Sequence, residues 1–267
     1  MPQGVSRARI LLVGGGGGGR SGPAAGGAAG SVNSGVLDVV PSLKIKVQVG
    51  KGGRGSTRKV TCDQDSQAGS ASSFGKLVAY GGGSHKGTCP QSWAGPSGGS
   101  GGGEGCYNST NYCQSGDGGS GGFSGYNSTG GESYGPGSGA GAYDSQLQLF
   151  CFTQFTAGAG GRGQLEDSPG GGGAGGVLVT GEGPIAGSGE SVPGAEGGKG
   201  YGAGGGSGGY VGQNFNNASQ SMYYGGGAGS DGFVYVEWFG QPGPLLSSLQ
   251  NALNGQCYLC YVVLKLF

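Results

Sequence analysis

A run of six consecutive glycines, residues 14–19, follows directly on the apolar stretch Ile10-Leu11-Leu12-Val13. Glycine-dense tracts recur as far as Gly229, and the chain holds 74 glycines among its 267 residues. Such tracts bury little apolar surface, and glycine loses more conformational freedom on folding than any other residue. The chain therefore either leaves these tracts disordered or orders them through an unusual arrangement of backbone hydrogen bonds.

Overall composition alone favours disorder. Leucine, isoleucine, valine and phenylalanine make up 46 of the 267 residues, and glycine with proline makes up 85. Both values are typical of low-complexity chains, although the net charge of zero is not. A disordered glycine-rich filler therefore remains one hypothesis for this chain.

The distribution of the apolar residues argues against that hypothesis, because they gather into short alternating runs between the glycine tracts. In residues 43–49, four apolar residues alternate with Lys44, Lys46 and Gln48, a period of two that predicts a half-buried strand. No segment before residue 244 has convincing helical periodicity. We therefore expect a mainly β protein with little α-helix. The other strands are expected at residues 9–13, 36–40, 73–80, 146–155, 177–180 and 233–239.

The glycines at positions 14, 16 and 19 match a dinucleotide-binding fingerprint, and Asp38 lies about twenty residues further on. That mechanism requires a helix directly after the glycines, but residues 20–30 contain Pro23 and four glycines, which oppose a helix. His85 is the one histidine, and no nucleophile–base pair or metal-ligand set can be placed around it. We therefore expect no enzyme activity, no catalytic residue, no cofactor and no metal site.

The glycine tracts can instead be structural elements of their own. Extended threefold chains of the polyproline II type form no internal hydrogen bonds, so their amides and carbonyls point outward toward neighbouring chains. Only glycine lets backbones approach closely enough for those bonds to form. The sequence then predicts polyglycine II helices joined to a small β-sheet layer.

Three junctions of strand and glycine tract support a resemblance to a known family: residues 10–19, 43–53 and 73–83. The later stretches 200–211 and 225–236 are similar to the end of the extracellular glycine-rich domain in the anaplastic lymphoma and leukocyte tyrosine kinase receptors. The chain also resembles glycine-rich domains of phage tail-fibre adhesins. The resemblance implies a polyglycine helix bundle attached to a small β layer, and it implies no functional residue.

Cysteines and glycosylation sequons suggest an oxidising location, either extracellular, at a cell surface or on a virion. The start of the chain shows no apolar leader, so we expect an upstream start or another route to the surface, such as incorporation into a virus particle. The pair Cys257 and Cys260 is half of a zinc motif without its other half, and is better explained as structural. The glycosylation candidates are Asn108, Asn127 and Asn217, and the disulfide candidates are Cys62, Cys89, Cys106, Cys113 and Cys151.

Charge is strongly segregated along the chain. Residues 1–86 hold 11 basic and 3 acidic residues, whereas residues 87–267 hold 3 and 11. Such asymmetry can mark a surface that binds polyanions, although a solvated strand face and loop is the simpler interpretation. The basic residues are not interleaved with stacking aromatics, so nucleic acid is not an expected partner.

Polar loops rich in tyrosine lie between the glycine tracts, and tyrosine on a small-residue background suits a recognition surface. The candidates are Tyr107, Tyr112, Tyr126 and Tyr134, of which Tyr107 and Tyr126 each begin the sequence Tyr-Asn-Ser-Thr. Rings that cap and shield the bundle are the alternative. The partner would be a protein or glycan surface ligand, or further copies of the chain.

We divide the chain into a glycine-rich β/polyglycine-bundle domain, residues 1–243, and a C-terminal apolar tail, residues 244–267. The tail is expected to hold a short helix and a strand, or to bind a partner, and it is too short to span a membrane. The function that the sequence favours is a non-enzymatic surface or virion module for adhesion or assembly. An ice-binding protein and a coat or matrix protein are the alternatives, besides the disordered filler.

Overall fold

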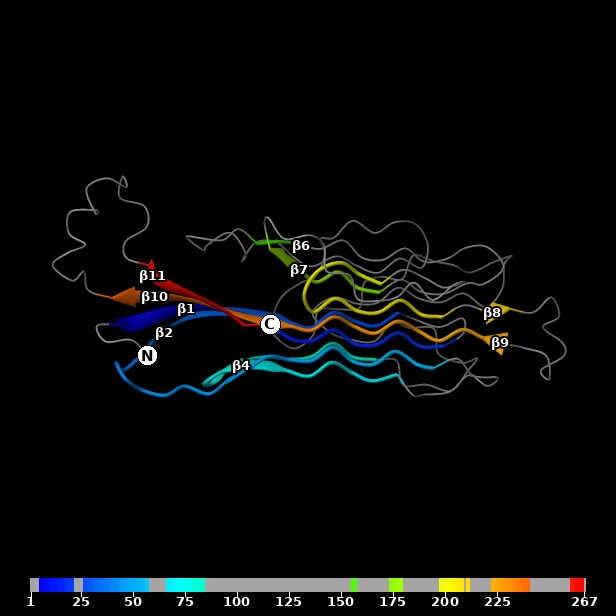
Figure 1. Cartoon of the computed structure of the whole chain (residues 1–267), viewed down its shortest axis with the longest axis horizontal. Helices are drawn as coiled ribbons and strands as arrows, with labels where there is room; N and C mark the ends of the chain where they lie inside the picture. The colour runs from blue at the N-terminus through cyan, green and yellow to red at the C-terminus, as the bar shows by residue number, and fades with distance from the viewer. Residues whose placement is uncertain are drawn as a thin grey trace.

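A computed structural model describes residues 5–21, 26–57, 66–84, 155–157, 173–179, 197–208, 210–211, 222–240 and 260–266 (Figure 1). The described residues contain short antiparallel β-sheets and extended glycine-rich segments, with no α-helix among them. The four-stranded and three-stranded sheets lie toward one end of the molecule, and the glycine-rich segments run side by side away from them (Figure 1). The expected mainly β character with little α-helix is confirmed for these residues.

The central sheet has four strands in the order β11-β10-β1-β2, all antiparallel. They are β1 (Val5–Val13), β2 (Val32–Asp38), β10 (Phe233–Gly240) and β11 (Cys260–Leu266). Val13, the last residue of β1, lies opposite both Val32 and Phe233. The ends of β1, β2 and β10 that connect to glycine-rich segments therefore lie next to one another in the sheet.

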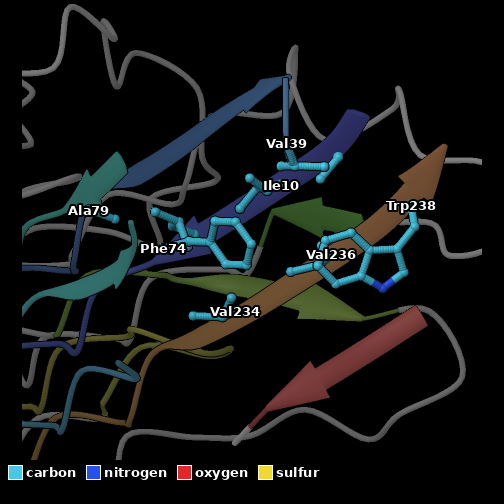
Figure 2. Close-up of a cluster of buried hydrophobic side chains, with 9 residues drawn as sticks. Ile10, Val39, Phe74, Ala79, Val234, Val236 and Trp238 are labelled. Carbon is cyan, nitrogen blue, oxygen red and sulfur yellow. The ribbon is translucent and has the colours of Figure 1, made fainter. Parts of the chain in front are cut away.

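One face of the central sheet is covered by a three-stranded sheet in the order β3-β4-β5. Its strands are β3 (Val47–Gln48), β4 (Ser72–Phe74) and β5 (Leu77–Ala79). Alternate residues of β1 and β10 point toward it and form a buried cluster with Phe74, whose ring centroid lies 6.1 Å from that of Trp238 (Figure 2). The cluster consists of Ala8, Ile10, Leu12, Val39, Phe74, Ala79, Val234, Val236 and Trp238.

The opposite face is covered by β6 (Phe155–Ala157) and β7 (Val177–Val179), which pair with each other. The aromatic ring of Phe155 stacks on Phe233 at 5.7 Å and meets Tyr235 edge-on at 5.0 Å. Burying side chains of this size contributes about 1.5–3 kcal/mol each. Both faces of β1 are therefore covered, which explains why its run of four apolar residues is continuous and does not alternate.

The short hairpin of β8 (Tyr210–Val211) and β9 (Met222–Tyr223) lies at the other end of the molecule, where the glycine-rich segments stop (Figure 1). Within the described ranges, no helix has the length and apolar character required to cross a bilayer.

Several expected strands differ in detail from the observed ones. The run 73–80, expected as one strand, is the hairpin of β4 and β5, because Gly75 adopts a φ of 57° and turns the chain. In residues 43–49 only Val47 and Gln48 enter a ladder, although Ile45 and Val49 still pack on the Phe74 cluster. Most of the run 146–155 lies outside the described residues.

Candidate functional site

The central segment, residues 14–19, donates its amides to three other segments in strict rotation. Its first and fourth residues bond to segment 26–31, its second and fifth to segment 66–70, and its third and sixth to segment 224–232. The donor–acceptor pairs are Gly14 N to Ser31 O at 3.0 Å, Gly15 N to Ser70 O at 3.0 Å, Gly16 N to Ser230 O at 2.9 Å, Gly17 N to Ala28 O at 2.8 Å, Gly18 N to Gln67 O at 2.9 Å and Gly19 N to Gly227 O at 2.8 Å. Successive amides of the central segment therefore point in three directions, and all three acceptor segments run antiparallel to it.

The carbonyls of the central segment accept from three further segments, 50–57, 80–84 and 201–208. The pairs are Gly82 N to Gly15 O at 2.8 Å, Gly53 N to Gly16 O at 2.8 Å, Gly205 N to Gly17 O at 2.9 Å and Ser56 N to Gly19 O at 3.0 Å. Since Gly53 and Ser56 bond to Gly16 and Gly19, segment 50–57 runs parallel to the central segment. Segments 50–57 and 80–84 follow β3 and β5, just as the central segment follows β1.

The six surrounding segments also bond to one another and close a ring. The contacts around the ring include Ser31 N to Tyr80 O at 2.8 Å, Gly69 N to Gly82 O at 2.9 Å, Ser70 N to Lys51 O at 2.8 Å, Gly229 N to Gly53 O at 2.9 Å, Ser230 N to Ala203 O at 2.8 Å and Gly27 N to Gly205 O at 2.7 Å. We call the central segment and its six neighbours the glycine scaffold. Buried backbone groups need hydrogen-bond partners, and the glycine scaffold supplies them without a conventional apolar core.

Glycine is required along the central segment because each of its α-carbons faces a backbone carbonyl. A Cβ built on Gly14 or Gly17 would overlap the carbonyl oxygen of Tyr80 or Gly83. The same holds for the other four positions, whose obstructing carbonyls belong to Lys51, Ala203, Arg54 and Gly206. As at the axis of collagen, only a residue without a side chain fits here.

Two buried serines join segments near the ends of strands. The hydroxyl of Ser72 accepts from Gly50 N at 2.8 Å and donates to Val13 O at 2.6 Å. The hydroxyl of Ser230 accepts from Ala203 N at 2.7 Å and donates to Gly200 O at 2.7 Å. The hydroxyl of Ser72, at the start of β4, therefore links β1 to the glycine scaffold, whereas that of Ser230, shortly before β10, links two glycine-rich segments.

The described residues are therefore organised around glycine-rich segments that are held together by backbone hydrogen bonds. A family model described as a glycine-rich domain matches residues 1–239. The chain belongs to the glycine-rich domain family. That membership confirms the family predicted from the strand–glycine junctions. Neither a curated protein nor a solved structure matches the chain.

The limits of the glycine-rich domain match can be compared with the sheet. The match ends at residue 239, within β10, and β11 therefore lies beyond it. β11 nevertheless pairs with β10, with Val236 opposite Leu264. The central sheet of this chain thus includes a strand that is not part of the matched domain.

The structure buries several polar side chains of the glycine-rich domain that the sequence did not mark as candidate site residues. Arg20 and Ser21 continue the central segment and are 1% and 0% exposed. Glu237 on β10 is also fully buried, and the hydroxyl of Tyr235 lies 3.2 Å from its carboxylate. Burial raises the pKa of Tyr201, whose ring packs 4.9 Å from that of Phe233. Among the described residues, no three His, Cys, Asp or Glu side chains gather into a metal-binding group.

The sites predicted from sequence lie outside the described residues. This applies to the recognition candidates Tyr107, Tyr112, Tyr126 and Tyr134, to the glycosylation candidates Asn108, Asn127 and Asn217, and to the disulfide candidates Cys62, Cys89, Cys106, Cys113 and Cys151. They therefore stay predictions. The described ends that lead toward several of them, at Thr57 and Ser84, are the ends of segments that run away from the sheets.

Proposed function

We propose that the glycine scaffold is a bundle of polyglycine II helices. The supporting observation is the repeat of three in the bonds of residues 14–19, whose amides all donate to other segments. Polyproline II geometry has three residues per turn and no internal hydrogen bonds, so it directs successive amides toward three neighbours. A β-strand repeats every two residues and would direct them toward two.

The bundle serves as a rigid, non-enzymatic support for binding or assembly. Ordering glycine is entropically expensive, so a chain that orders seven such segments gains a stiff and closely packed body in return. Segment 80–84 ends away from the sheets, and the chain continues from it into the stretch that holds the tyrosine-rich sequences. Rigid scaffolds that present loops from one end are a common arrangement for recognition.

The tyrosine-rich stretches are the proposed contact regions, with Tyr107 and Tyr126 as the first candidates. Tyrosine offers a large apolar ring and a hydroxyl at low conformational cost, and small polar neighbours let the ring reach its partner. The protein would act outside a cell or on a virion, which the cysteines and the sequons support. Its ligand would be a protein or a glycan, and further copies of the chain could assemble through the same regions.

Limited proteolysis combined with an array experiment tests this function. A protease-resistant fragment close to residues 7–239 is expected, and the full chain should bind ligands on a glycan or cell-surface protein array. Tyr107→Ala and Tyr126→Ala should reduce that binding without changing the resistant fragment. Cleavage throughout residues 7–239 would instead identify a disordered filler, and binding that ignores both substitutions would exclude the tyrosine loops.

A further inference from the structure

The stretch from residue 44 to residue 57 holds its basic side chains at exposed positions. In its first part every second residue is exposed, namely Lys44, Lys46 and Gln48. From Gly50 onward every third residue is exposed, namely Lys51, Arg54 and Thr57. The period changes from two to three where the extended strand gives way to the glycine-rich segment. The exposed side chains of both parts nevertheless follow one continuous stretch of chain.

Lys76 adds a further cation beside this stretch. It lies in the turn between β4 and β5, next to Gly75, whose amide donates to the carbonyl of Lys46 at 3.0 Å. The intervening side chain of Ile45 packs on the Phe74 cluster, so the lysines beside it face solvent. We call Lys44, Lys46, Lys51, Arg54 and Lys76 the basic row.

Little negative charge within the described residues offsets the basic row. These residues include three acidic side chains, of which Asp38 pairs with Arg7 at 3.3 Å and Glu237 is buried. The third, Asp231, bonds to Lys51 at 2.6 Å. Within the described residues, three of the five cations, Lys44, Lys46 and Lys76, have no ion-pair partner.

We infer that the basic row binds a linear anionic polysaccharide laid along residues 44–57. Neighbouring cations are separated by about 7 Å in the first part, from the rise of a strand, and by about 9 Å in the second, from the rise of a threefold chain. A row of separate point charges suits a polymer with one sulfate or carboxylate on each sugar or every second sugar. The inference rests on the proposed binding function and adds a second contact region on the side of the scaffold.

Nucleic acid fits this row less well. Single-stranded nucleic acid is held by aromatic side chains on which its bases stack. The exposed residues of the row from Lys44 to Thr57 include no aromatic residue. The exposed residues of this stretch therefore offer charges and no stacking surface. A sugar polymer with regularly spaced anionic groups can bind to such charges without any stacking.

Binding of a fluorescently labelled heparin oligosaccharide to the full chain tests the inference by fluorescence anisotropy. Lys44→Gln combined with Lys46→Gln should raise the Kd about fivefold, the effect of losing two exposed ion pairs. Arg7→Gln combined with Lys199→Gln removes the same charge elsewhere and should leave the Kd within about twofold. The thermal midpoints of both variants should match that of the parent protein, because all four side chains are exposed.

Each other outcome overturns the inference. An equal rise in Kd in both double variants would show a general charge effect. No binding of the oligosaccharide by the parent chain would show that the basic row is only solvated surface. Tighter binding of single-stranded DNA that depends on Lys44 and Lys46 would make the row a nucleic-acid site. Oligosaccharide binding lost in Tyr107→Ala and retained in the lysine variant would assign the ligand to the loops, and the proposed function would then stand without the row.

Discussion

The hydroxyl of Ser72 lies 2.6 Å from the carbonyl oxygen of Val13, although 59 residues separate them in sequence. Val13 ends β1, and Ser72 begins β4 in the sheet that covers it. The same hydroxyl accepts the amide of Gly50 at 2.8 Å, so one side chain links three segments at the junction of the sheets and the glycine scaffold. Ser72 is fully buried.

Ser72→Ala should therefore destabilise the protein by about 2 kcal/mol, because a buried backbone amide and a buried carbonyl both lose this partner. The neighbouring Ser73→Ala is the matched control, since Ser73 is only half-buried and points to the other face of the strand. Its effect should stay within about 0.5 kcal/mol. Urea unfolding of the two variants measures both values, and equal midpoints would contradict a linking role for Ser72.

Alanine at the centre of the glycine scaffold should be far more damaging than alanine in the sheet. In Gly17→Ala the new methyl group overlaps the backbone of Gly83, which cannot rotate away, and the expected cost is about 3 kcal/mol or more. In Gly35→Ala on β2 the methyl group meets the side chain of Leu77 at 3.4 Å, an ordinary contact. That variant should stay within about 0.5 kcal/mol of the parent in thermal unfolding. A tolerated Gly17→Ala would contradict the observed packing.

The turn after β2 contains a residue that glycine should improve. Leu43 N donates to Val40 O at 3.2 Å, and Ser42 adopts a φ of 66° within this turn. A left-handed conformation costs a non-glycine residue about 1–2 kcal/mol, whereas glycine loses about 0.5–1 kcal/mol through its greater freedom when unfolded. Ser42→Gly should thus raise the free energy of unfolding by about 0.5 kcal/mol. Ser42→Val, which cannot relieve the strain, should lower it.

Tyr201 should make the fold sensitive to alkaline pH. Burial raises the pKa of Tyr201, so the unfolded chain loses the phenolic proton first, near its ordinary pKa of about 10. The contribution of neutral Tyr201 to the free energy of unfolding is therefore complete below that pH. It is lost as the pH rises toward the pKa of the folded state. Tyr201→Phe should therefore show a smaller fall in thermal midpoint between about pH 9 and 11 than the parent. Tyr80→Phe, at a 62% exposed position, should follow the parent profile.

The sequence alone predicted the family, the mainly β character and the strands β1, β7 and β10, because short apolar runs bounded by glycine have few other interpretations. It did not predict β8 or β9. The strand around Ile10 and the strand around Val236 were placed correctly from their apolar residues. The hairpin at Gly75 was missed because a single glycine within a run that reads as a strand does not distinguish a turn from a bulge. In contrast, nothing local marks which segments become neighbours in space.

The linking serines could not be predicted for the same reason. Ser72 stands in a stretch where serine is common, Ser230 stands alone in a glycine tract, and only the contacts with Val13 and Gly200 reveal their role. Likewise, the repeat of three in residues 14–19 is invisible in a run of identical residues, since it exists only in the order of their partners. The tyrosine loops, predicted from composition, await their own test.

Hydrogen exchange of the amides of residues 14–19 tests the central claim most directly. All six amides donate to other segments at 2.8–3.0 Å, so peptides covering this run should exchange only when the whole domain unfolds. Their protection should fall together with global stability in the Gly17→Ala variant. Exchange of these glycines at the rate of an unstructured peptide would contradict the account, because a hydrogen-bonded glycine scaffold could not then exist in solution.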